Sequence, residues 1–524
     1  MHPSTAAQHT CAMMRLGGLR GFLSAVLAVA LVAPALDTAW TSRTPSVTSL
    51  VDPSLRAGEV ALVHTTTGHA GALSTSLAQL GATDLETDAA ADTVVARLSP
   101  AALDAIRTDA RVTVATSDIT VVASGGIRGN KGFEKERLTD VAASLTATRA
   151  PFAWLRTTGE GVVVAIMDTG IADHPDLRGK VSARLDFVGD GNTQLDPAGH
   201  GTFIAGLVAA NGSTRGVAPG ASLVSLRVLD AQGNGKLSGV VKAFDWLLRN
   251  GKRLGVRVLN VSWGAPQATS YHKDLLSALV EAAWFSGITV VVAVGNDGPD
   301  AGTVTAPATD PFVVSVGSYN DMGTLLTSDD VASTFTARGP TLDGFAKPDT
   351  LAPGEHVLGL RVSGLVYSDA SGAPIGSTTD RYIHMTGTSA SSAFVTGVAA
   401  LVKAARPSAT PNDVKGAIVA SGRQVQGSSV TAVDAFSALT RNGTANAGLV
   451  PSRLLAKILT TAHQLNVNGV SWENVNWDVV SWDGVSWETV SWETVAWETI
   501  SWETVAWETV TWEGVSWEDS VSAE

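Results

Sequence analysis

The middle of the chain alternates short, almost uninterrupted apolar runs with longer stretches of helical periodicity. The apolar runs occur at residues 161–167, 222–229, 256–261, 288–294 and 312–316. Runs without polar alternation are typical of strands buried on both faces of a parallel sheet. Helical spacing of apolar residues lies between them, at residues 202–210, 238–249 and 271–285. This alternation predicts an α/β domain with a doubly wound, mostly parallel sheet, at residues 148–440.

A smaller unit precedes this domain, between residues 58 and 122. Its strand-like segments are residues 59–64, 93–98 and 112–122, and its helix-like segments are residues 72–80 and 100–108. We therefore expect a small α+β domain. The stretch that follows, residues 123–147, begins rich in Gly and charge, which is typical of a linker or a processing region.

The C-terminal part, residues 471–518, repeats units such as Ser-Trp-Glu-Thr-Val, with Trp at every fifth position. Five residues advance about 140° around a helix, so a helix would carry Trp on every face. In a strand the odd step puts successive Trp on opposite faces. This favours a β-type repeat, or else a low-complexity segment that orders on a partner. Residues 441–470 are predicted to link this tail to the α/β domain.

Charge is concentrated in the tail. Residues 464–524 contain twelve acidic residues and no Lys or Arg, so they account for nearly all of the net charge of −13. The rest of the chain is close to neutral. Nucleic-acid binding needs a basic face, and the charge distribution does not indicate one.

The N-terminus has the features of a secretory signal. Two arginines precede an apolar run at residues 22–33, and an A-x-A-like cleavage motif follows. The run is short for a membrane span. Residues 1–35 are therefore predicted to direct secretion. The single cysteine, Cys11, would leave with them, which excludes disulfides and Cys-ligated metals from the mature chain.

Four short segments carry side chains of a catalytic type. Asp168 ends an apolar run in the segment VAIMDTGI, and Asn296 follows another in VVVAVGNDGP. His200 opens a helical stretch in GHGTFIAG, and Ser389 opens another in GTSASSAFVTG. Ligands of open α/β sheets bind at the carboxyl ends of the strands, so these four side chains are predicted to meet there.

These segments resemble the active-site signatures of subtilisin-like serine proteases, in the chain order Asp, His, Ser. The resemblance covers about residues 148–421. It implies that Ser389 is the nucleophile, that His200 is its general base and that Asp168 orients the imidazole. It also implies that the Asn296 amide donates to the oxyanion.

Two residues near Ser389 depart from the family pattern. Ala393 stands where the family usually has Pro, and Ala390 stands where it usually has Met. Neither change removes a catalytic group.

Two further segments resemble the substrate-binding strands of the family. They are Gly233, Asn234 and Gly235, and Ser262, Trp263 and Gly264. The resemblance implies that they bind an extended peptide by strand addition. It further implies that residues 58–122 form an inhibitory pro-domain and that the precursor processes itself. This chemistry needs no cofactor; structural calcium is common in the family, but no calcium site is assigned.

Other classes of activity fit the sequence less well. A metalloprotease motif such as H-E-x-x-H is absent, and the order Asp, His, Ser differs from that of α/β-hydrolases. The prediction is a secreted serine endopeptidase, whose partners are protein or peptide substrates and its own pro-domain. The alternative is a binding or adhesion protein, in which the Trp-rich tail contacts a cell surface or a polymer and the α/β domain is a scaffold. Loss of Ser389 would abolish a protease and matter little to an adhesin.

Overall fold

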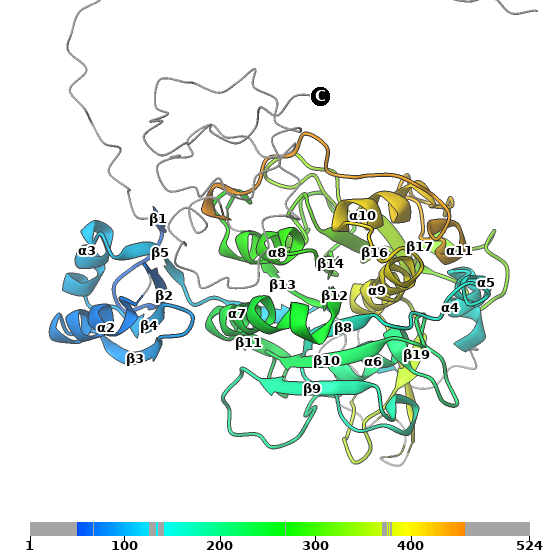
Figure 1. Ribbon diagram of the computed structural model, residues 1–524, viewed down its shortest axis with the longest axis horizontal. Helices are drawn as coiled ribbons and strands as arrows, with labels where there is room; N and C mark the ends of the chain where they lie inside the picture. The colour runs from blue at the N-terminus through cyan, green and yellow to red at the C-terminus, as the bar shows by residue number, and fades with distance from the viewer. Residues whose placement is uncertain are drawn as a thin grey trace, which may run out of the picture. The chain divides into compact units, whose positions relative to one another are not determined.

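The computed structural model describes residues 50–66, 68–124, 133–134, 141–267, 269–368, 375, 377 and 380–455 (Figure 1). The predicted signal segment and the Trp-rich tail lie outside the described residues. Most of the predicted processing region lies outside them as well, at residues 125–132 and 135–140. The described parts are an N-terminal module that ends at residue 124 and a larger domain from residue 141 onward, with the short strand β7 (Phe133–Glu134) between them.

The larger domain is built on an eight-stranded sheet in the order β17-β16-β14-β12-β8-β10-β9, with β18 beside β16. All pairs are parallel except β17, which runs antiparallel to β16. The strands are β8 (Val163–Asp168), β9 (Val181–Asp186), β10 (Ser222–Arg227), β12 (Val256–Val261), β14 (Thr289–Ala293), β16 (Val314–Asn320), β17 (Val331–Ala332) and β18 (Thr350–Pro353). The five apolar runs of the sequence correspond to β8, β10, β12, β14 and β16. The prediction of a doubly wound, mostly parallel sheet is confirmed.

Helices cover both faces of this sheet. Helices α7 (Leu237–Leu254) and α8 (Leu275–Phe285) lie on one side, and α6 (His200–Ala209) and α9 (Thr388–Ala405) lie on the other (Figure 1). Shorter helices complete the domain: α4 (Val141–Ala147), α5 (Ala150–Ala153), α10 (Pro411–Ala420) and α11 (Ala435–Ala438). Helix α9 is apolar and long enough to cross a membrane, but 89% of it is buried. We therefore read it as a core helix of the domain.

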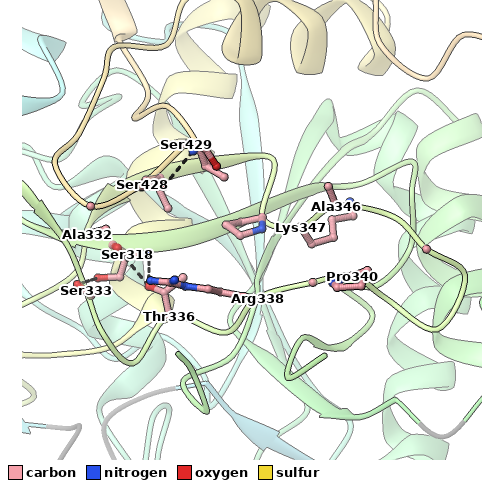
Figure 2. Close-up of a pocket in the computed structure, with 16 residues that line it drawn as sticks. Ser318, Ala332, Ser333, Thr336, Arg338, Pro340, Ala346, Lys347, Ser428 and Ser429 are labelled. Atoms are coloured by element: carbon pink, nitrogen blue, oxygen red, sulfur yellow. Dashed lines mark hydrogen bonds between the residues drawn. The ribbon is translucent and has the colours of Figure 1, made fainter. Parts of the chain in front are cut away.

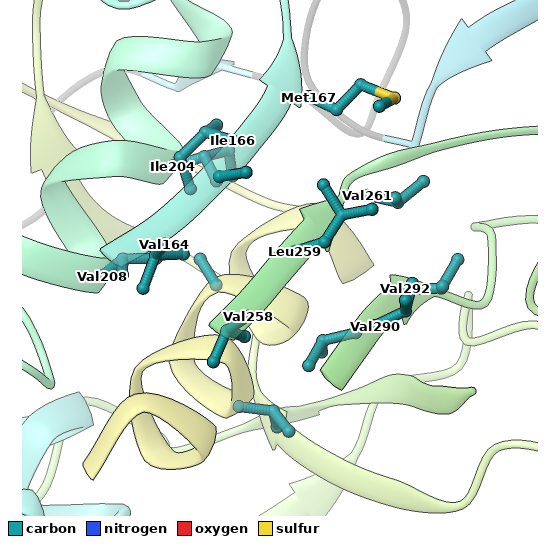
Figure 3. Packing of buried hydrophobic residues seen from close by; sticks show 14 of the residues in the cluster. Val164, Ile166, Met167, Ile204, Val208, Val258, Leu259, Val261, Val290 and Val292 are labelled. Carbon is teal, nitrogen blue, oxygen red and sulfur yellow. The ribbon is translucent and has the colours of Figure 1, made fainter. Parts of the chain in front are cut away.

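Apolar packing fixes α6 against the central strand β8. Ile204 and Val208 are one turn apart on α6, and they lie against Ile166 and Val164 of β8 (Figure 3). Alternate residues of a strand share a face, which is why Val164 and Ile166 point together toward the helix. This packing brings the carboxyl end of β8 close to the first turn of α6. Those are the positions of Asp168 and His200.

The N-terminal module has its own five-stranded sheet in the order β1-β5-β2-β4-β3. Its elements are β1 (Leu50–Val51), β2 (Val60–Thr65), α2 (Ala70–Gln79), β3 (Thr83–Asp88), β4 (Thr93–Arg97), α3 (Pro100–Thr108) and β5 (Val112–Ser117). A separate hydrophobic core includes Val63, Leu73 and Ile106. The module thus has the expected α+β composition.

The sequence analysis predicted one strand over residues 112–122, whereas the structure has two. Strand β5 ends at Ser117, and β6 (Thr120–Ala123) pairs with the larger domain. The break falls at Asp118, whose carboxylate accepts hydrogen bonds from Ser238 N and Ser238 Oγ at 2.9 and 3.0 Å. Ser238 is in the first turn of α7, where backbone N–H groups lack helical partners. Asp118 therefore caps α7 at the point where the chain leaves the sheet of the N-terminal module.

Candidate active site

Asp168 and His200 form a buried pair. Asp168 is the last residue of β8 and His200 is the first of α6. His200 Nδ1 lies 2.7 Å from Asp168 Oδ1, and both side chains are fully buried. Asp168 Oδ1 also accepts a hydrogen bond from Thr169 N at 2.7 Å. An imidazole bonded to a carboxylate through Nδ1 is held with Nε2 free to accept a proton.

Ser389 lies in the first turn of α9, where Gly387 is the N-cap and provides no side-chain cap. Its hydroxyl donates to the carbonyl oxygen of Ser262 at 3.1 Å. His200 Nε2 has no hydrogen-bond partner among the described residues. The structure therefore brings Asp168 and His200 together, whereas no hydrogen bond joins Ser389 to His200, its predicted general base.

Asn296 and the N-terminus of α9 point two donors at a single oxygen. The carbonyl oxygen of Ser124 accepts a hydrogen bond from Asn296 Nδ2 at 2.5 Å and a longer one from Ser389 N at 3.4 Å. Asn296 Oδ1 accepts a hydrogen bond from Thr388 N at 2.9 Å, which fixes the orientation of the amide. The positive end of the α9 helix dipole also lies at this oxygen and favours negative charge on it. Donors that converge on a carbonyl oxygen stabilise the negative charge that develops there during acyl transfer.

Both predicted substrate-binding segments flank strand β6. Strand β6 runs antiparallel to β11 (Asn234–Lys236) on one side and to β13 (Trp263–Pro266) on the other. The pairing continues beyond the strands, because Ala123 N donates to Gly233 O at 2.9 Å and Ser124 N donates to Ser262 O at 2.8 Å. The chain's own segment 120–124 is thus bound by strand addition.

Gly235 has no room for a side chain. A Cβ atom there would lie 2.3 Å from Val228 O and 3.1 Å from Val121 Cγ2. A side chain at Gly235 would therefore clash with the Val228 carbonyl and displace β11, which holds the bound strand. Val121 is completely buried against this strand, whereas the next side chain, Val122, is 48% exposed.

A polar network behind the site was not predicted from the sequence. Asn260 Nδ2 donates to Ser262 Oγ at 2.7 Å, and Ser262 Oγ lies 2.9 Å from Ser392 Oγ. Thr396 Oγ1 donates to Asn260 Oδ1 at 2.8 Å. The network connects β12 to α9 and fixes the position of Ser262. The carbonyl oxygen of Ser262 accepts hydrogen bonds from Ser389 Oγ and Ser124 N. A signal was present: Asn260 interrupts an apolar strand, and Ser389, Ser392 and Thr396 share one helix face.

A cavity of about 470 Å³ is separate from these residues (Figure 2). Its lining includes Ser318, Thr336, Arg338 and Ser428, and none of its lining residues belongs to the candidate active site. Within the described part of the chain, no group of three or more His, Cys, Asp or Glu side chains could hold a metal ion.

The doubly wound sheet, with an Asp–His pair and a serine at its carboxyl edge, defines the chain as a protein of subtilisin-like architecture. A model of the Subtilase family (Peptidase_S8) matches residues 159–466. The chain belongs to the subtilase family.

Individual relatives agree with this assignment. Serine protease AprX of Bacillus subtilis (strain 168) is 38% identical over 270 residues, which are 49% of this chain and 60% of that protein. Subtilisin Savinase of Lederbergia lenta is 35% identical over 269 residues, or 50% of this chain and 84% of that protein. The structure resembles fervidolysin from Fervidobacterium pennivorans, a keratinolytic enzyme related to subtilisin, with a TM-score of 0.60 and 22% identity. That likeness covers 80% of this chain and 67% of fervidolysin, and it concerns the fold.

Proposed function

We propose that this protein is a serine endopeptidase that cleaves its own precursor. One observation carries the proposal. The Ser124 carbonyl oxygen lies between Asn296 Nδ2 and Ser389 N, while β11 and β13 hold the segment before it in an extended conformation. A peptide carbonyl held in this way is positioned for attack. Serine protease AprX and Subtilisin Savinase, which match the chain, support the same class of reaction.

In the proposed mechanism, Ser389 Oγ leaves the carbonyl of Ser262 and donates to His200 Nε2. It then attacks the substrate carbonyl carbon while His200 takes its proton. Asp168 stabilises the resulting imidazolium, and Asn296 Nδ2 and Ser389 N stabilise the oxyanion. The C–N bond breaks as His200 protonates the leaving amine. Water, activated by His200, then hydrolyses the acyl-enzyme and restores the serine.

The bond between Ser124 and Gly125 is the proposed site of self-cleavage. It lies within the predicted processing region, and Ser124 occupies the position of the residue that supplies the scissile carbonyl. After cleavage, residues 120–124 would remain paired with β11 and β13 and block the cleft. Contacts outside the cleft hold the module in addition, because Asp118 caps α7 and Lys242 of α7 forms an ion pair with Glu86. This supports the role of an inhibitory pro-domain for the module that ends at Ser124.

The position of the module also favours a cleavage preference. Val121, four residues before the proposed scissile bond, is fully buried, and Ser124 is 8% exposed. We propose that the cleft prefers a small residue immediately before the cleaved bond and a compact aliphatic residue three positions earlier.

Mass analysis of the Ser389→Ala variant tests the proposal. The wild-type protein should yield a product that begins at Gly125, whereas the Ser389→Ala protein should stay uncut. Ser429→Ala, an exposed serine far along the chain, is the matched control and should be processed normally. Normal cleavage of a purified Ser389→Ala precursor would overturn the proposal.

Export through residues 1–35 and an accessory anchoring role for the Trp-rich tail are part of the same proposal. Both segments lie outside the described residues, so these two roles are proposed from the sequence patterns. The alternative of a binding protein that acts through this tail stays a prediction. Processing that depends on Ser389 would argue against it.

A further inference from the structure

One carboxylate near the site is used by neither the proposed chemistry nor substrate binding. Asp196 precedes His200 by four residues and is 1% exposed. It lies in the loop between β9 and α6, and its two oxygens have separate sets of partners. Oδ1 accepts hydrogen bonds from Thr169 Oγ1 at 2.8 Å and from Gly199 N at 2.7 Å. Oδ2 accepts from Thr202 N at 2.7 Å and from Thr202 Oγ1 at 2.5 Å.

These contacts make Asp196 the cap of the helix that carries His200. The N-cap residue of α6 is Gly199, which has no side chain to accept from the first N–H groups. Asp196 accepts from the third residue of the helix, Thr202, and Thr169 Oγ1 accepts from the second, Gly201, at 2.9 Å. Two backbone N–H groups in the first turn of α6 thus find their hydrogen-bond acceptors outside the helix.

The same carboxylate reaches the strand that carries Asp168. Thr169, which donates to Asp196, is the residue directly after Asp168. Asp196 thus has one oxygen bonded to the neighbour of Asp168 and the other bonded to the first turn of the His200 helix. Asp196 therefore links the backbone beside Asp168 to the first turn of the His200 helix, in addition to the direct hydrogen bond between Thr169 and Gly201.

Close backbone packing encloses the link. A Cβ atom on Gly170 would lie 1.9 Å from Leu195 O, and one on Gly201 would lie 2.1 Å from Gly170 O. On the other side, a Cβ atom on Gly199 would lie 1.9 Å from the Tyr367 hydroxyl oxygen. Burial raises the pKa of Asp196, while the hydrogen bonds from Thr202, Thr169 and Gly199 oppose that change. Backbone N–H groups can only donate, so the bonds to both oxygens fit the carboxylate form.

We infer that Asp196 is a positioning residue for the peptidase reaction, which sets the distance and orientation between Asp168 and His200. The inference rests on the proposed function for its kinetic consequence. Asp196 touches neither β11 nor β13, so its loss should lower turnover and leave substrate binding unchanged. A small displacement of a catalytic group is enough to cost about 100-fold in rate.

The test compares two aspartates that cap helices, Asp196 at α6 and Asp274 at α8. Asp196→Asn replaces one carboxylate oxygen by an NH₂ group that faces other donors. Asp274→Asn makes the same change at the N-cap of α8, where Asp274 accepts from Leu276 N and Ser277 N at 3.3 and 3.1 Å. Helix α8 carries none of the candidate active-site residues. Both variants should lose thermal stability, but only Asp196→Asn should lose about 10- to 100-fold in kcat, with KM unchanged.

A milder pair of variants tests the same link if the Asp196→Asn protein does not fold. Thr169→Val removes the hydroxyl that bridges Asp196 and Gly201 with little change in shape, and Thr169→Ser keeps it. We expect kcat to fall in Thr169→Val and to be restored in Thr169→Ser. Equal kcat values in the two Thr169 variants, or equal losses in Asp196→Asn and Asp274→Asn, would overturn the inference.

A readout without turnover separates this inference from the proposed function. In Ser389→Ala protein, proton NMR should detect the His200 Nδ1–H proton at low field, because it is hydrogen-bonded to Asp168. Adding Asp196→Asn should shift or broaden that signal, and adding Asp274→Asn should not. An unchanged signal in the Asp196→Asn protein would refute the positioning role even if the wild-type protein had no peptidase activity.

Discussion

A buried acid pair between α8 and the loop before β16 should make the stability of the domain depend on pH. Asp310 and Glu281 are both fully buried and close enough to affect each other's titration. Burial raises the pKa of Asp310 to about 7 from an ordinary value of 3.8, although the nearby ammonium groups of Lys347 and Lys415 oppose the change. The pKa of Glu281 is also raised, by burial first and then by the charge of Asp310.

The sign of the effect follows from the raised pKa. Between about pH 4 and pH 7, Asp310 ionises in the unfolded chain but stays protonated in the folded one. The stability that protonated Asp310 contributes to the folded protein is therefore fully present below about pH 4, and it is lost as the pH rises toward 7. Each pKa unit corresponds to about 1.4 kcal/mol. The shift of Asp310 from 3.8 to about 7 thus predicts a loss of up to about 4 kcal/mol.

Asp310→Asn removes this titration and retains an oxygen that can accept from Phe312 N, as Asp310 Oδ1 does at 2.9 Å. We expect the free energy of unfolding of the variant, relative to the wild type, to rise by up to about 4 kcal/mol between pH 4 and pH 8. Urea unfolding of both proteins in a Ser389→Ala background, which prevents self-digestion, measures this difference. Subtraction cancels the shared groups that do not interact with Asp310, so the difference reports on Asp310 together with Glu281.

An exposed aspartate provides the control. Asp300→Asn changes the same functional group at the surface and serves as the reference. If the Asp310→Asn difference varies with pH no more than the Asp300→Asn difference, burial does not raise the pKa of Asp310. The account of the buried pair is then wrong.

Three further predictions concern the site and the tail. Asn296→Leu should lower kcat by about 10²–10³, the loss measured for one oxyanion-hole donor in subtilisin, with little change in KM; steady-state kinetics on a short peptide decide this. Gly235→Val should hinder docking of residues 120–124 and slow self-cleavage by about tenfold or more, or about 1.4 kcal/mol, and a time course of intact mass would show a normal rate if this is wrong. Truncation after Gln464 should leave the melting temperature and peptide turnover unchanged; a large drop in either would make the tail a structural part of the enzyme.

The sheet was predictable because its strands are buried on both faces. Residues 256–261, for example, are apolar at four of six positions, and the run coincides with β12. Strand β3 was missed, since its residues, Thr-Asp-Leu-Glu-Thr-Asp, are mostly exposed and carry no apolar alternation. The pairing of β3 with β4 depends on backbone hydrogen bonds, which any sequence can form.

Candidate site residues were predictable where a motif fixed them, but their partners depend on contacts between distant parts of the chain. Ser124 lies in a Gly-rich segment, and nothing local distinguishes it from its neighbours. Its place between Asn296 and Ser389 becomes visible only when β6 is paired with β11 and β13. Strand addition of this kind is set by the edges of other strands, so residues 120–124 could not show it alone.

The role of Asp196, in the loop between β9 and α6, likewise depends on contacts with distant parts of the chain. Three aspartates lie in or beside this loop, and the sequence offers no reason to separate them. Arg227 pairs with Asp186 and Asp190, whose side chains are 43% and 30% exposed, whereas Asp196 is buried and bonded to the start of α6. The partly exposed carboxylates of Asp186 and Asp190 keep contact with water, whereas a buried carboxylate is stable only where donors replace its lost water. The donors around Asp196 belong to Thr169, Gly199 and Thr202, which meet only because α6 packs on β8. The apolar contacts that define the fold therefore create the environment in which this carboxylate can act on Asp168 and His200.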